Sequence, residues 1–428
     1  MIRLDRVSAN ALATWSRGIV AVLLGFFASR WLLATVGTEG YGLWVVACGM
    51  VALASLVHGV LASATGRFLS VAAGRGDIPI WFAASAKLHF VAALATVLVG
   101  LPACLAYVRC GAVPPERVAD VSVVVAVLFA KSFAVMANTP FRQLFAAHQR
   151  MVEPAVWGCA DAVFNFAMLA WMVTHPGEWF VAYAAATAAV GVAVEAALCA
   201  RARRVFGSMR VCGIATRANI AEIFRFAGWR FVSDGGWVVS TQGVAVLVNG
   251  LLGAALAASA GIARTVSTHC ASLSESVGQA YDPAIANVVG ASGHVRQLVR
   301  TACVRLACAY LVFAAPLALL VDPVLRFWLG EVPPQASACV LWLLATGALD
   351  VLGRAFYSAV TAHGNVRGLY IGVGLLHGAA IPLGALLWRM APSLGLHAIF
   401  ASLFATHIAS LAWTLATYRK LVVRSCVG

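Results

Sequence analysis

Long apolar stretches follow one another along almost the whole chain, and they dictate what it can fold into. Hydrophobic residues make up 62% of its 428 residues and charged residues 11%, whereas about half and about a quarter are usual in soluble domains. A helix that crosses a membrane needs about 20 mostly apolar residues. We therefore predict an all-α polytopic membrane protein with about twelve transmembrane helices, at residues 11–36, 40–63, 81–107, 121–146, 154–174, 179–200, 226–250, 254–281, 301–321, 336–362, 366–389 and 394–418.

The 30 Lys and Arg residues are distributed unevenly around these spans. With the N-terminus placed in the cytoplasm, 18 of them fall in or beside cytoplasmic loops, 4 in or beside external loops and 8 within the spans. Basic residues accumulate on the cytoplasmic side of membrane proteins, which predicts that both termini are cytoplasmic. The net charge of +14 is then explained by the orientation of the spans and by contact of the basic loops with anionic membrane lipids. We expect no nucleic-acid partner.

A basic loop at residues 201–225 separates six spans from six more. We divide the chain into an N-terminal six-helix lobe, residues 1–200, this cytoplasmic linker, and a C-terminal six-helix lobe, residues 226–428. Because each lobe has an even number of spans, a repeat between them is parallel. A self-match at an offset of 216 positions supports such a repeat, because it aligns Val36-Gly37 with Leu252-Gly253 and Ala72-Ala73-Gly74 with Val288-Val289-Gly290.

Sequence motifs for catalysis and cofactor binding are absent from the chain. No lysine follows glycine as in a Walker loop, and neither HExxH nor GxSxG occurs, so we expect no built-in ATPase and no serine-nucleophile chemistry. No CxxC pair and no helical pair of histidines is found, which predicts no metal site. The longest external loops have about 13 and 14 residues, too few for a catalytic domain. We expect neither an enzyme nor a bound cofactor.

Eight basic residues are embedded in the apolar stretches, namely Arg17, Arg30, Lys87, Lys131, Arg230, Arg264, Arg305 and Arg354. Each costs about 3 kcal/mol at the bilayer centre, so those that cannot reach the interface need an anion or a wet cavity. Lys131 is near the middle of the fourth span and shares a helix face with Asn138 and Arg142. Arg264 begins a polar stripe in the eighth span. Neither has an acid three or four positions away, which makes these two the best candidates for binding an anionic substrate.

Other embedded basic residues have competing explanations. Arg17 and Arg30 are each close enough to an end of the first span to be interface anchors as well as cavity residues. Arg354 follows Asp350 by four positions, a spacing at which the two charges can neutralise each other, and Arg230 and Asp234 have the same spacing. Four further substrate-binding candidates remain: Arg354, Arg17, Arg30 and Lys87.

Carboxylates within the spans are candidates for coupling transport to an ion. Asp161 shares a face of the fifth span with Asn165, where a carboxylate suits proton coupling and equally suits hydrogen bonding between helices. Asp234 and Asp350 are the other candidates. Glu195 is near the cytoplasmic end of the sixth span, so we expect it at the interface.

Several short motifs, in order and spacing, resemble those of a known family. They are Val36-Gly37-Thr38-Glu39-Gly40-Tyr41-Gly42-Leu43-Trp44 between the first two spans, Arg67 with Gly74-Arg75-Gly76-Asp77 after the second, Phe224-Arg225-Phe226-Ala227-Gly228 opening the seventh, Leu252-Gly253, and Pro283-Ala284-Ile285-Ala286. Over essentially its whole length the chain resembles the bacterial polysaccharide flippases of the multidrug, oligosaccharidyl-lipid and polysaccharide exporter superfamily. It departs from the family at Gln242-Gly243, where an acid is common, and at Ala258-Ser259-Ala260, where a Gly-x-Tyr is common.

The resemblance implies two six-helix lobes around a central cavity that alternately opens to either side. It also implies a lipid-linked oligosaccharide as the substrate, carried on undecaprenyl pyrophosphate from the cytoplasmic to the periplasmic leaflet of the bacterial inner membrane. Glycosyltransferases and a polysaccharide polymerase of the same pathway are the implied partners. Cations at Lys131 and Arg264, one in each lobe, suit the pyrophosphate.

Three other functional classes stay open. An ion-coupled multidrug exporter has the same lobes but moves mostly cationic drugs, for which a cavity rich in carboxylates is expected. A membrane glycosyltransferase or polymerase needs a sizeable external loop with catalytic acids or bases. A membrane scaffold leaves the buried cations without a purpose.

Overall fold

Helices make up nearly all of the structure. The computed structural model describes the chain except for residues 1–3, 76, 149, 176, 178, 208–215, 292–294, 363–366 and 428. None of the described residues lies in a strand. Within the described ranges, ten helical stretches are long and apolar enough to cross a membrane. The chain is a multi-pass, all-α membrane protein, as its composition predicts.

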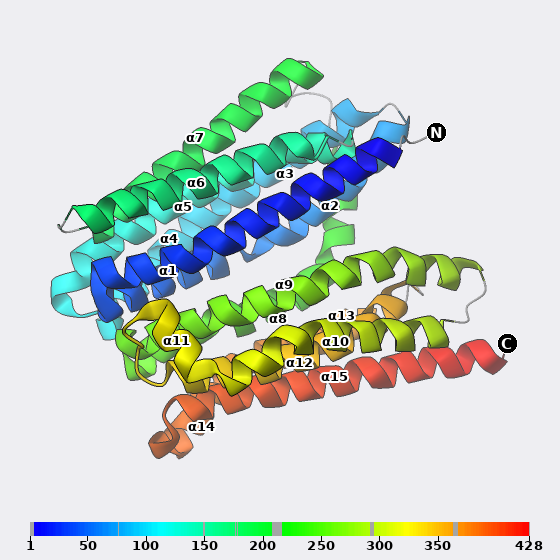
Figure 1. Ribbon diagram of the computed structural model, residues 1–428. Helices are drawn as coiled ribbons and strands as arrows, with labels where there is room; N and C mark the ends of the chain where they lie inside the picture. Colours follow the sequence, from blue (N-terminus) through cyan, green and yellow to red (C-terminus); the bar gives the residue numbers. More distant parts are fainter. Residues whose placement is uncertain are drawn as a thin grey trace. The chain divides into compact units, whose positions relative to one another are not determined.

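Fifteen α-helices are found in the described part of the chain (Figure 1). They are α1 (Leu4–Ala54), α2 (Leu56–Arg75), α3 (Ile78–Ala95), α4 (Leu101–Tyr107), α5 (Val118–Ala147), α6 (Val152–Thr174), α7 (Phe180–Phe206), α8 (Arg217–Leu252), α9 (Ala254–Ala291), α10 (Arg296–Leu319), α11 (Val321–Leu329), α12 (Ala336–Ala362), α13 (Arg367–Gly378), α14 (Ala380–Met390) and α15 (Leu396–Val427). Two five-residue π-helical segments join α3 to α4 and extend α4.

The predicted first and second spans meet inside α1. Gly37 has a φ of 73° and a ψ of 174°, which breaks the helix there. A left-handed φ of this kind is cheap only for glycine, so the residue ends one helical rod and begins the next. The second rod continues past Ser55 into α2. The break at Gly37 therefore divides α1 into two helical rods, which correspond to the first two predicted spans.

The two halves of the chain keep the same register over their whole length. Gly253 has a φ of 91° and is 216 positions after Gly37. The same offset relates the ends of α2 and α9, at Arg75 and Ala291. It also relates the ends of α6 and α14 and the starts of α7 and α15. The parallel repeat predicted from a few small residues thus extends to the helix boundaries.

The chain divides into two compact units, Met1–Phe231 and Val232–Gly428. The division falls within α8 because the first turns of that helix pack on the first unit. Ile223 and Ala227 join a core with Val60, Leu61 and Ala64. The Arg67 guanidinium also lies 4.2 Å from the centre of the Phe226 ring. The predicted lobe limits at 200 and 226 stay a prediction, and Gly76 and the middle of the linker, 208–215, lie outside the described residues.

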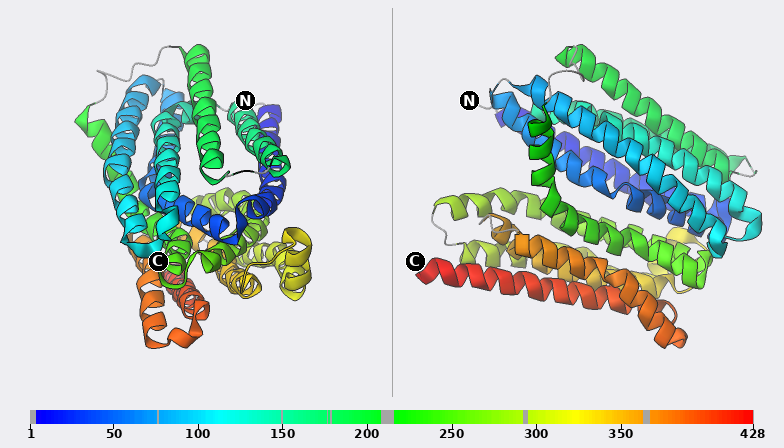
Figure 2. Two further views of the ribbon diagram at one scale, coloured as in Figure 1. Left: turned by 90° about the vertical axis from the view of Figure 1, so that its left-hand side faces the viewer. Right: turned by 180° about the vertical axis from the view of Figure 1, so that it is seen from behind.

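Within each unit the helices run up and down beside one another (Figure 2). In the first unit, α5 contacts α1, α2, α3 and α7, and Phe82, Phe141 and Phe145 form part of the core between them. In the second unit, α12 contacts α9, α10 and α15. The central position of α5 and of α12 explains why polar groups on these two helices meet partners from several neighbours.

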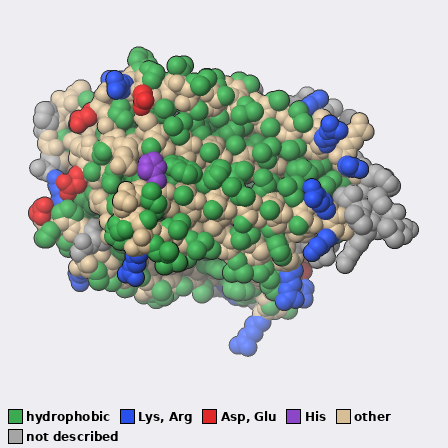
Figure 3. Space-filling view, turned by 90° about the horizontal axis from the view of Figure 1, so that it is seen from below, with side chains coloured by type: hydrophobic (Ala, Val, Ile, Leu, Met, Phe, Trp, Pro, Cys, Tyr) green, Lys and Arg blue, Asp and Glu red, His purple; other side chains and the backbone are tan. Residues whose placement is uncertain are grey.

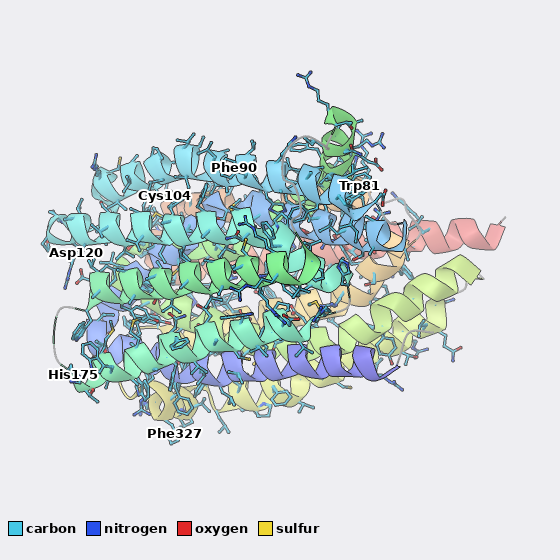
Figure 4. All side chains as sticks on the ribbon, turned by 90° about the horizontal axis from the view of Figure 1, so that it is seen from above. Trp81, Phe90, Cys104, Asp120, His175 and Phe327 are labelled. Atoms are coloured by element: carbon cyan, nitrogen blue, oxygen red, sulfur yellow. The ribbon has the colours of Figure 1, made fainter. Side chains whose placement is uncertain are left out.

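The outer surface is suited to lipid. On the face drawn in Figure 3, hydrophobic side chains cover the middle, and most Lys, Arg, Asp and Glu side chains lie toward the ends. Large apolar residues such as Phe90 and Phe327 are exposed. In the first unit, Asp120 and His175 lie at one end and Trp81 at the other (Figure 4). This arrangement places the hydrophobic band between two polar ends, as a bilayer requires.

Candidate functional site

Lys131 lies in the first unit, near the middle of α5, and is half-buried. Its aliphatic chain crosses Gly191 of α7, where a Cβ atom would overlap the lysine Cε and lie 3.1 Å from Nζ. Glycine at this position therefore provides the space that the lysine occupies. Among the described residues, the Lys131 ammonium makes no hydrogen bond or ion pair. It is within electrostatic reach of Glu195, one turn further along α7.

Glu195 is buried within the first unit. Its exposed fraction is 3%, and its carboxylate accepts a hydrogen bond from the Arg142 guanidinium of α5 in an ion pair. Glu195 is covered because α5 packs on this turn of α7, and its position at the membrane interface stays a prediction. The two charged residues on the predicted polar face of α5 therefore differ: Arg142 is neutralised by Glu195, whereas no acid in the described part of the chain pairs with Lys131.

Asp161 is half-buried on α6 and is engaged within its own helix. The Asn165 amide donates to the Asp161 carboxylate at 3.1 Å and to its main-chain carbonyl at 2.7 Å. Asp161 is also within electrostatic reach of Glu195. The hydrogen bonding observed here runs along one helix and not between two. A role for Asp161 in ion coupling stays a prediction.

The remaining basic candidates of the first unit are more peripheral. Arg17 is exposed on α1, and its Cδ atom lies against Gly158 of α6. Arg30 is exposed on the same helix, and Lys87 is half-buried on α3. Neither Arg30 nor Lys87 forms an ion pair with a described residue. Their participation in substrate binding stays a prediction.

Arg264 is the corresponding cation of the second unit and is half-buried on α9. Its guanidinium makes no hydrogen bond or ion pair within the described part of the chain. The residues of the polar stripe that begins at Arg264 differ in their surroundings. Ser267 donates a hydrogen bond to the carbonyl of Leu343 on α12 at 3.3 Å, while Thr268 and Glu275 are exposed.

Asp350 does not pair with Arg354. The Asp350 carboxylate on α12 faces the His407 ring on α15, with Oδ2 3.5 Å from Nε2. The Arg354 side chain instead crosses Gly278 of α9, where a Cβ atom would overlap it. The i, i+4 spacing therefore predicted the wrong partner, because the packing of α15 on α12 brings a histidine closer to the carboxylate. Asp234 is half-buried on α8, and its role in coupling stays a prediction.

Two histidines and one aspartate form a group that the sequence did not predict. Ligand atoms of Asp350, His377 and His407 all lie within 4.8 Å of one another, although the three residues come from α12, α13 and α15. Spacing along the sequence does not indicate this group, because its members are 27 and 30 positions apart. Their meeting depends on how three helices pack, and the expectation of no metal site, which considered sequence spacing alone, stays a prediction.

Comparison with known proteins gives matches in structure but not in sequence. No protein-family model matches the chain, and no curated protein sequence does. The lipid II flippase MurJ in an inward closed conformation matches with a TM-score of 0.73 and 10% identity, over 98% of this chain and 91% of that one. An inward-facing multidrug resistance MATE family transporter of the MOP superfamily matches with a TM-score of 0.61 and 15% identity, over 97% and 98%.

A third match comes from Pyrococcus furiosus and is a MOP superfamily transporter described as having a binding pocket of reverse polarity and a suggested different function. Its TM-score is 0.61 at 15% identity, over 97% of this chain and 95% of that one. At these identities the comparisons establish the fold alone. The all-helical fold implied by the resemblance is confirmed, and the three matched proteins are described as a lipid II flippase and as transporters.

Proposed function

We propose that this protein is a flippase that moves an undecaprenyl-pyrophosphate-linked oligosaccharide across the bacterial inner membrane for the assembly of a surface polysaccharide. The observation that carries the proposal is that two embedded basic residues lack ion-pair partners among the described residues, whereas a buried acid has one. Lys131 and Arg264 are half-buried and have no ion pair among the described residues, whereas the buried carboxylate of Glu195 is engaged by Arg142. Available positive charge inside the membrane suits an anionic substrate.

The chemistry of the substrate explains why one cation from each unit is useful. A pyrophosphate loses its water shell when it enters the membrane and needs charged donors to replace the lost hydrogen bonds. Ammonium and guanidinium groups provide such donors, and the guanidinium can bind two phosphate oxygens at once. The polyprenyl tail remains in the lipid while the two lobes alternate between their inward and outward states.

The protein would act between enzymes of one pathway. Glycosyltransferases would supply the lipid-linked oligosaccharide on the cytoplasmic side, and a polymerase would consume it on the periplasmic side. This order places the protein in the inner membrane with both termini in the cytoplasm, as the distribution of Lys and Arg predicts.

A multidrug exporter is the second candidate, because a MATE transporter shares the fold. A cationic drug would need an available carboxylate. The first unit offers Asp161, whose carboxylate accepts a hydrogen bond from Asn165, and the second unit offers the exposed carboxylate of Asp350, but Lys131 and Arg264 would repel the drug. The balance of charge therefore favours the flippase.

The test neutralises each cation in cells that depend on this protein for surface polysaccharide. Lys131→Ala and Arg264→Ala are each expected to lower the flipping rate at least about tenfold, because a hydrogen bond to a charged group contributes about 1.5–3 kcal/mol. Lipid-linked intermediate should accumulate in the cytoplasmic leaflet, where it is quantified by its protection from an external glycosidase. Lys131→Arg should keep more activity than Lys131→Ala.

Matched controls are Lys420→Ala and Arg326→Ala, which remove exposed basic residues near helix ends. Both should leave the flipping rate unchanged. Wild-type polymer in the Lys131→Ala/Arg264→Ala double variant would contradict the proposal. Loss of drug resistance in Asp161→Asn cells, with normal polysaccharide, would favour the exporter instead.

A further inference from the structure

Asp350, His377 and His407 form a compact polar group in the second unit, which we call the imidazole–carboxylate cluster. His377 and His407 are buried, and their rings stack with centroids 4.4 Å apart. The Asp350 side chain closes one side of the cluster and is 43% exposed. The cluster is therefore buried on the side of the two rings and accessible along the carboxylate.

The hydrogen bonding of His407 fixes which of its nitrogens carries a proton. Its Nδ1 atom lies 2.9 Å from the carbonyl oxygen of Leu403. A carbonyl can only accept, so Nδ1 is the donor. In the neutral ring Nε2 is then a bare lone pair, and it faces Asp350 Oδ2 at 3.5 Å. Two acceptors that face each other need a positive charge between them.

His377 is a second reason to expect a cation in the imidazole–carboxylate cluster. Both of its ring nitrogens are buried and have no hydrogen-bond partner among the described residues. A buried polar group left without a partner costs about 1–3 kcal/mol. A proton between His407 and Asp350 would satisfy those two residues but would leave His377 unpaired. A metal cation that takes His377 as a third ligand gives a partner to one nitrogen of His377 as well as to His407 and Asp350.

We propose that Asp350, His377 and His407 bind a divalent transition-metal cation of the zinc type. Two imidazoles and one carboxylate are a ligand set that such cations prefer, whereas Mg²⁺ and Ca²⁺ prefer oxygen ligands alone. Three protein ligands leave a fourth position open. The site does not depend on which substrate the protein moves.

The geometry is close to what a tetrahedral ion requires. Bonds of about 2.0–2.1 Å place neighbouring ligand atoms about 3.3 Å apart, and the 3.5 Å between Asp350 and His407 is near this value. The ligand atoms of all three residues lie within 4.8 Å of one another, so metal binding requires a small further approach of these atoms. Leu403 holds His407 through the opposite nitrogen, as carbonyl groups commonly do for metal-binding histidines. The exposed side of Asp350 gives the ion access.

The experiment measures metal binding to the full-length protein, purified in detergent and stripped of metal with a chelator. Co²⁺ is added first, because the intensity of its visible absorption distinguishes four-coordinate from six-coordinate sites. We expect one Co²⁺ per chain, displaced by one Zn²⁺, and a higher Tm with Zn²⁺ than without. Asp350→Asn and His377→Leu should each weaken Zn²⁺ binding at least about tenfold.

His377→Leu is the decisive variant, because the ring it removes makes no hydrogen bond with a described residue. Its Tm without metal should be no lower than that of the wild type, so a loss of binding cannot be ascribed to unfolding. His397→Leu is the matched control, since His397 is an exposed histidine on the same helix as His407. This control should bind Zn²⁺ like the wild type. The proposal is overturned if the wild type binds no metal, or if His377→Leu retains the same stoichiometry and affinity.

Discussion

A lysine in the middle of a membrane helix needs space as well as charge compensation, and Gly191 provides the space for Lys131. The same arrangement recurs where Gly278 lies under Arg354 and Gly158 under Arg17. The sequence predicts which basic residues are embedded, because it shows the apolar residues around them. It cannot predict what they touch, because Gly191 and Lys131 are on different helices. For the same reason the burial of Glu195 could not be foreseen.

At the residue scale, the buried ion pair of Arg142 and Glu195 should be sensitive to the loss of one partner. Arg142→Ala leaves the Glu195 carboxylate buried without compensation, which costs up to about 3–5 kcal/mol. We expect a lower Tm for Arg142→Ala, and recovery of most of that loss when Glu195→Gln is added. Thermal unfolding followed by size-exclusion chromatography in detergent provides the measurement.

The control for this prediction is the ion pair of Arg201 and Glu153, whose Nε and Oε2 atoms are 2.7 Å apart in a more exposed position. Exposed pairs contribute about 0–1 kcal/mol, so Arg201→Ala should change the Tm little. An equal decrease in Tm for Arg142→Ala and Arg201→Ala would show that the burial of Glu195 does not increase the contribution of its ion pair to stability.

At the element scale, α8 and α13 approach so closely that only glycine fits between them. A Cβ atom on Gly374 would overlap the main-chain carbonyl of Val232, and one on Gly236 would overlap that of Gly374. Close approach through small residues is a common way for membrane helices to associate. The sequence shows the glycines, and it predicts the helices to within a few residues in most cases. It does not show which two helices use the glycines to meet.

Gly374→Ala should therefore separate α8 from α13 and destabilise the second unit. Overpacking of a tight contact costs about 1–3 kcal/mol. Gly378→Ala is the matched control on α13, because its added Cβ would have no heavy atom closer than 4.0 Å. Comparison of the Tm of the two variants measures the effect. Similar values would mean that α8 and α13 do not pack through these glycines.

At the scale of the whole molecule, the sequence predicted the architecture, whereas the orientation derived from charge stays a prediction. The apolar stretches predicted the all-helical fold, and Gly37 and Gly253 revealed the repeat before any helix was placed. The imidazole–carboxylate cluster could not be predicted, because it needs the rotation and packing of α12, α13 and α15. The pattern of apolar and polar residues identifies the polar face of a single helix. It does not show which faces of three different helices pack together to form a site.

The predicted topology can be tested with reporters fused to truncated chains. Fusion after Gly207 should give green fluorescence and no alkaline phosphatase activity, because the basic loop that follows α7 is expected in the cytoplasm. Fusion after Pro114 or Gln335 should give phosphatase activity and no fluorescence. The reverse pattern at all three positions would invert the orientation and with it the proposed direction of transport.

The shared register of the two halves has an evolutionary consequence. Asp161 and His377 are 216 positions apart, as are Gly191 and His407, and Lys131 and Gly347. Such a repeat is what duplication of a half-length gene produces. The two positions that hold Lys131 and Gly191 in the first half hold Gly347 and His407 in the second. If the two proposals hold, one scaffold serves an anion in the first half and a metal cation in the second.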